Sequence, residues 1–125
     1  MNQQTVNQRT IQISLDLEKT NAHSPIFDAA FQRAVTAAFA TLGDSAQKVL
    51  FKCLESDFGI PQHNVSADPA ALADALEKIF GPAAAWLIEA RIIRVLHSLV
   101  PEFKYASTNG GLLFLDFVEG LASFL

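Results

Sequence analysis

The sequence contains little cysteine, no long hydrophobic run and no excess of positive charge, and each shortage excludes a class of protein. The single cysteine rules out an internal disulfide and fits a reducing cytoplasm, which is the location that we expect. The net charge of −4 argues against mainly electrostatic binding to nucleic acid or to an anionic membrane, so neither is an expected partner. No apolar segment reaches the roughly 18 residues of a membrane span, and the polar start MNQQTVNQRT lacks the pattern of a signal peptide.

The composition is instead that of a chain with a packed core. Half of the 125 residues are hydrophobic and 18% are charged, which excludes global disorder. A chain of this length suits one domain that buries roughly two-thirds of its unfolded surface. We expect residues 1–23 to form a polar N-terminus and a strand arm, and residues 24–125 to form a helical domain.

The most hydrophobic stretch, residues 82–100, is predicted to be the central helix. Placed at about 100° per residue, its apolar side chains, Trp86 among them, cover more than half of the helix circumference. Only a narrow stripe with Arg91, Arg94 and Ser98 is left for water. Because so apolar a helix requires neighbours on most sides, we expect the other helices to pack around it. The predicted fold is therefore mainly α, with about five helices and one N-terminal strand.

Four further helices are predicted from apolar periodicity and from glycine and proline stops, at residues 25–42, 45–58, 69–80 and 112–125. Ser24 is the expected N-cap of the first helix, and Asp44 that of the second, with Gln47 completing a capping box. The side chains expected to face the core include Phe27, Phe31, Ala34, Val35, Ala38, Leu42, Ala46, Val49, Leu50, Cys53, Leu54, Leu72, Ala75, Leu76, Ile79 and Phe80.

Residues 10–18 show the strict alternation that is typical of a half-buried strand. The apolar side chains on one face of this strand are Ile11, Ile13, Leu15 and Leu17. A lone strand leaves its backbone groups unpaired, so we predict that it pairs with the same strand of a second copy in a homodimer. The alternative is pairing within the chain with residues 103–105.

We interpret the cysteine and the three histidines as structural residues and not as parts of a site. Cys53 lies within an apolar stripe, where a thiol behaves as a small hydrophobe. His23, His63 and His97 have no partner at metal-ligand spacing on the same helix face. No catalytic, cofactor-binding or metal-binding residue is assigned, and no cofactor is expected.

Three charged residues of the central helix are candidate site residues. Glu89 falls within the apolar arc, where an unpaired carboxylate is costly. We expect an ion pair within the chain or across a dimer interface; the functional alternative is a general base of raised pKa or an anchor for a cationic ligand. Arg91 and Arg94 form an exposed basic stripe, interpreted as a solvated face, with contact to phosphate or an acidic partner as the alternative.

Three segments together resemble a known family: LGDSAQKVLFKCLESDFGI, DPAALADALEKIFGPAAAWLIEARIIRVLHSL and FLDFVEGL. They resemble the small helical output-domain family named after Nitrosopumilus, over about residues 27–125. The residues that carry the resemblance are Leu42, Gly43, Phe58, Gly59, Ile60, Pro69, Phe80, Gly81, Glu89, Ile92, Ile93 and Phe117. The resemblance implies a helical fold and an effector or interaction role in signalling proteins, with no catalytic residues to carry over.

The sequence therefore predicts a non-catalytic protein-interaction or signalling-output module that self-associates. The alternative is a small-molecule-binding regulatory domain, because ten phenylalanines are enough to line an apolar pocket. An enzyme ranks below both, since no nucleophile, metal set or acid/base pair emerges from the sequence, and DNA binding ranks low on charge grounds.

Overall fold

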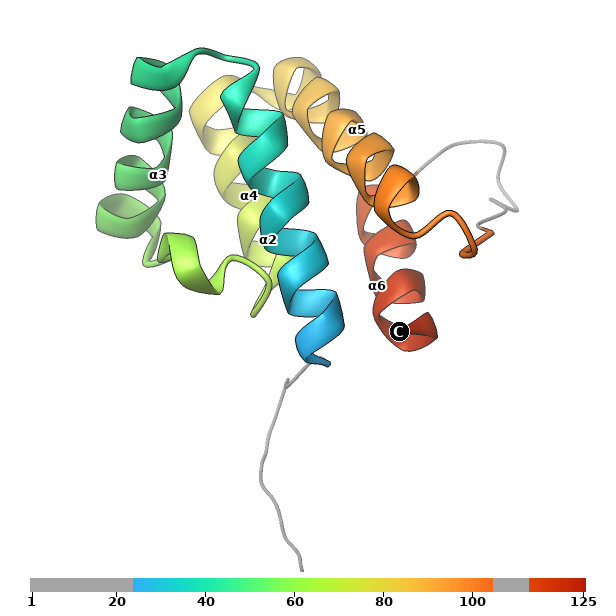
Figure 1. The fold of residues 1–125 in the computed structure, drawn as a ribbon. Helices are drawn as coiled ribbons and strands as arrows, with labels where there is room; N and C mark the ends of the chain where they lie inside the picture. Colours follow the sequence, from blue (N-terminus) through green and yellow to red (C-terminus); the bar gives the residue numbers. More distant parts are fainter. Residues whose placement is uncertain (1–23, 105–112) are drawn as a thin grey trace, which may run out of the picture.

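The computed structural model describes residues 24–104 and 113–125, and these residues form a helical bundle (Figure 1). The elements, in chain order, are α2 (Pro25–Ala40), α3 (Asp44–Phe58), the 3-10 helix η1 (Gln62–Asn64), α4 (Pro69–Phe80), α5 (Pro82–Leu99) and α6 (Phe114–Phe124). The prediction of a mainly helical fold with five α-helices is confirmed, and the described ranges contain no strand. The predicted strand at residues 10–18, with Ile11, Ile13, Leu15 and Leu17, lies outside the described residues.

Helix α2 lies in the middle of the bundle. It packs against α5 on one side and against α3 and η1 on the other. Helix α4 packs against α5 behind α2, and α6 closes the bundle against α5 and α4. Figure 1 shows the start of α2 at one end of the bundle and its C-terminal end beside the α4–α5 corner at the other.

The helix starts follow local chemistry, with one correction. The Ser24 hydroxyl accepts a hydrogen bond from the backbone N–H of Phe27 (3.1 Å), as predicted. The prediction that Asp44 is the N-cap of the second helix is wrong. Gly43 is the N-cap residue of α3, and it makes no side-chain cap hydrogen bond. Gln47 does not complete a capping box either. Its side-chain amide donates to the carbonyl of Thr36 (3.2 Å), which ties α3 to α2.

Phenylalanine rings fill the core along α2. The rings of Phe27 and Phe31 stack at 5.6 Å between centroids, and Phe31 also contacts Phe114 of α6 at 6.3 Å. Farther along the helix, Phe39 contacts Phe51 of α3 at 5.0 Å. Helix α2 buries six side chains and α5 buries five, so these two helices share the centre of the core.

The prediction that neighbours enclose the helix at residues 82–100 is wrong for one side of α5. Trp86 is 56% exposed and Leu87 is 62% exposed. Helices α2, α4 and α6 are its main neighbours, and the buried residues of α5, Ala85, Ile88, Ile92, Ile93 and Leu96, all lie on one half of the helix at about 100° per residue. The opposite half therefore keeps large apolar side chains in contact with water.

Several side chains that were predicted to face the core are also exposed. In α3, Val49 is 68% exposed and Ala46 is exposed, because α3 lies at the edge of the bundle and packs mainly against α2 and η1. Its buried side chains are Leu50, Phe51 and Leu54, so the inward face is rotated toward the Phe39 ring. Helical periodicity alone placed Val49 and Cys53 on that face and missed Phe51, and it also missed the buried Phe39 of α2.

Candidate functional site

An open groove lies where the C-terminal ends of α2 and α4 meet the first half of α5. Its volume is about 280 Å³, and we call it the α2–α4–α5 groove. It is lined by Ala38, Thr41, Leu42, Phe80, Ala84, Leu87, Ile88 and Arg91. Three stretches that are separate in the sequence therefore form one surface, which the helix packing alone brings together.

The groove has an unusually apolar rim. Leu42 is 42% exposed, Phe80 is 37% exposed and Leu87 is the most exposed of the three. The Thr41 hydroxyl donates to the carbonyl of Ala38 (2.6 Å), so the one hydroxyl of the lining is already used within α2. Single exposed apolar residues are normal on a protein surface, but several that gather around one depression are typical of an interaction site.

Each of these side chains is exposed because of its position at a helix end or on an uncovered face. Leu42 follows the end of α2 and precedes Gly43, and Phe80 is the last residue of α4 before the Gly81–Pro82 corner. Neither has a following helical turn to cover it. Leu87 lies in the second turn of α5, on the half opposite the buried residues of that helix.

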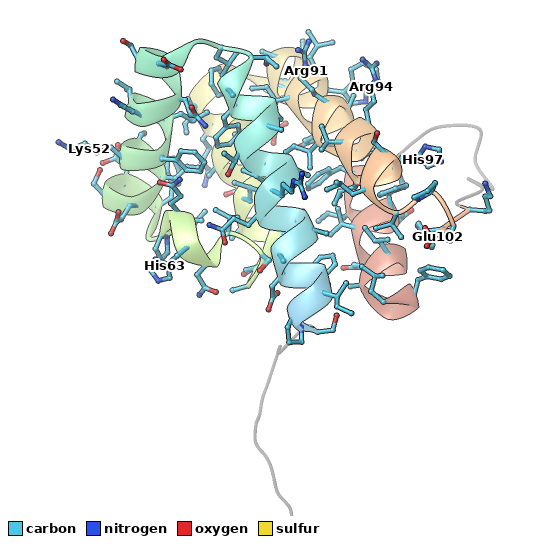
Figure 2. All side chains as sticks on the ribbon, viewed as in Figure 1. Lys52, His63, Arg91, Arg94, His97 and Glu102 are labelled. Carbon is cyan, nitrogen blue, oxygen red and sulfur yellow. The ribbon has the colours of Figure 1, made fainter. Side chains whose placement is uncertain are left out.

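Arginines border the apolar surface. Arg91 lines the groove, Arg94 follows three residues later on α5, and both point away from the bundle in Figure 2. Arg33 is exposed on α2. Within residues 24–104 and 113–125, none of these three arginines forms an ion pair. Arg91 and Arg94 thus lie on the exposed stripe, beside a groove that the sequence did not indicate.

The acidic residues of α2 and α5 are Asp28 and Glu89, and both are partly buried. The Asp28 carboxylate accepts a hydrogen bond from the buried hydroxyl of Ser66 (2.8 Å). Glu89 is half-buried and lies about 160° around α5 from Arg91. The exposed side of α5 therefore carries Arg91 and Arg94 with no exposed carboxylate on the same helix, although the chain carries a net charge of −4.

Glu89 lies on the side of α5 that faces α4. Partial burial raises the pKa of the Glu89 carboxyl, and the nearby negative charge of Glu77 raises it further. Among the described residues, no ion pair or hydrogen bond to the Glu89 side chain is formed, so the predicted cationic partner is not found in this part of the chain. A partner across a dimer interface stays a prediction.

The prediction that Cys53 is a core residue is wrong. The side chain is partly exposed on α3, and its thiol donates a hydrogen bond to Oδ2 of Asp57 (3.3 Å). That hydrogen bond, together with partial desolvation and the Asp57 charge, raises the pKa of the Cys53 thiol. A raised pKa lowers the thiolate fraction at neutral pH, which is the opposite of what a nucleophilic cysteine requires.

The histidines form no site in the described part of the chain. His63 and His97 are exposed on η1 and α5, in different parts of the bundle (Figure 2), and His23 lies outside the described residues. Among the described residues, no group of three His, Cys, Asp or Glu side chains is placed to hold a metal ion.

Most of the phenylalanines in the described part of the chain lie in the core. Six of them, Phe27, Phe31, Phe39, Phe51, Phe114 and Phe117, are buried. Phe80 borders the α2–α4–α5 groove, and Phe51 borders a second depression on α3 that is otherwise lined by polar and charged side chains. The aromatic content therefore serves mainly to fill the core.

Sequence reasoning missed the groove for two reasons. Leu42 and Phe80 fit the periodicity of the inward stripes, and periodicity does not show where a neighbouring helix ends. Leu87 did carry a signal, because at about 100° per residue it falls between Arg91 and Arg94 on the polar stripe of α5. A leucine in that position indicates an exposed apolar contact.

Comparison of the chain with family models, with curated proteins and with solved structures gives no match. The resemblance to the Nitrosopumilus-type output domains therefore stays a prediction. Within residues 24–104 and 113–125, no helix combines the length and the apolar character needed to cross a membrane.

Proposed function

We propose that this chain is a non-catalytic protein-binding module that self-associates, and that the α2–α4–α5 groove is its binding surface. The observation that carries the proposal is the position of Leu42, Phe80 and Leu87, three exposed apolar side chains around one groove. Burying such side chains against a partner stabilises a complex by about 25 cal/mol for each Å² of apolar surface removed from water. The proposal involves no cofactor, nucleic acid or membrane.

The partner in the proposal is a second copy of the chain, in a homodimer. The support is the alternating segment at residues 10–18, whose apolar side chains Ile11, Ile13, Leu15 and Leu17 require a surface to cover them. The groove offers an apolar surface of the complementary kind, and one chain carries both.

We further propose that this protein-binding module has a signalling-output role in the cytoplasm. It is supported by the positions of the residues that carry the family resemblance. The Phe58-Gly59-Ile60 corner ends α3 with Gly59 at φ 67°, where the N–H of Ile60 donates to the carbonyl of Leu54 (2.9 Å). Gly81 likewise connects α4 to α5. These residues direct the chain between helices, so they support the fold expected of the family more directly than its role.

The test is a mass measurement by light scattering on the full-length chain over a wide concentration range. We expect a mass that rises from 13.6 kDa toward twice that value. Leu87→Asp should suppress the rise, whereas Val49→Asp, a matched change at the exposed Val49 of α3, should leave it intact. A mass of 13.6 kDa at every concentration would overturn self-association. If one metabolite also raised the Tm of that monomer, the alternative of a small-molecule regulator would be favoured.

A further inference from the structure

We draw no further inference here: the strongest candidate, the exposed face of α5 that carries Trp86, Leu87, Arg91 and Arg94 beside the α2–α4–α5 groove, supports no proposal because nothing in the structure shows what covers it.

Discussion

Replacing Gly120 with alanine tests how tightly α6 packs against the segment that follows α5. Gly120 lies inside α6, where alanine is favoured over glycine by about 0.8–1.0 kcal/mol because glycine loses more backbone entropy on folding. A Cβ atom placed at Gly120, however, lies 3.0 Å from Cζ of Phe103, which is closer than ordinary van der Waals contact. Helix propensity and steric contact therefore act in opposite directions.

The Phe103 ring has little freedom to move away. Its centroid lies 5.4 Å from that of Phe117, in an edge-on contact, and 5.4 Å from that of Phe124. A shift of the ring disturbs both side chains, and overpacking of this kind costs about 1–3 kcal/mol. Since that cost exceeds the gain in propensity, we expect Gly120→Ala to lower the free energy of unfolding by about 0–2 kcal/mol.

A double-mutant cycle measures the two contributions separately. Phe103→Leu removes the outer ring atoms, so in that background only the helix propensity remains. There, Gly120→Ala should raise the free energy of unfolding by about 0.8–1.0 kcal/mol. Urea denaturation of the four proteins gives both differences. If Gly120→Ala changes stability by the same amount in both backgrounds, Phe103 does not contact Gly120 and the reasoning is refuted.

Three further predictions concern single groups. A raised pKa means that the folded chain holds the Glu89 proton more tightly than the unfolded chain does, so stability falls as the pH rises from about 4.3 through the raised pKa. Glu89→Gln should remove this fall and raise the Tm at neutral pH but not at acidic pH, as thermal melts across pH would show; an unchanged Tm at neutral pH would contradict it. Asp57→Asn should speed the labelling of Cys53 by a thiol reagent in the native state, because it removes the group that raises the thiol pKa; slower labelling would be inconsistent with the hydrogen bond. Ser66→Ala should lower the free energy of unfolding by about 1.5–3 kcal/mol, because the buried Ser66 hydroxyl donates a partly buried hydrogen bond to the Asp28 carboxylate, and a much smaller loss in urea denaturation would argue against that bond.

The sequence by itself determined the helices and the corners between them. Ser24 and Pro25, Asp68 and Pro69, and the corner at Gly81 act through backbone geometry and hydrogen bonds within a few residues, so their effect does not depend on the rest of the fold. Strong periodicity likewise identified buried residues in α2 and α4, where neighbours cover a full stripe.

The tertiary structure alone decided how far each helix is covered. Val49, Cys53 and Trp86 fit apolar stripes, yet they are wholly or partly exposed because α3 lies at an edge and α5 is covered on one half. Periodicity records which face is apolar, but burial depends on where the neighbouring helices begin and end.

The tertiary structure alone also decided the α2–α4–α5 groove. Leu42, Phe80 and Leu87 come from three segments, and no local pattern places them side by side. Two helix ends and one uncovered helix face meet there because α2 and α4 both pack against α5 near its start. A surface of this kind is a property of packing between distant segments, so it becomes visible only when the helices are placed in space.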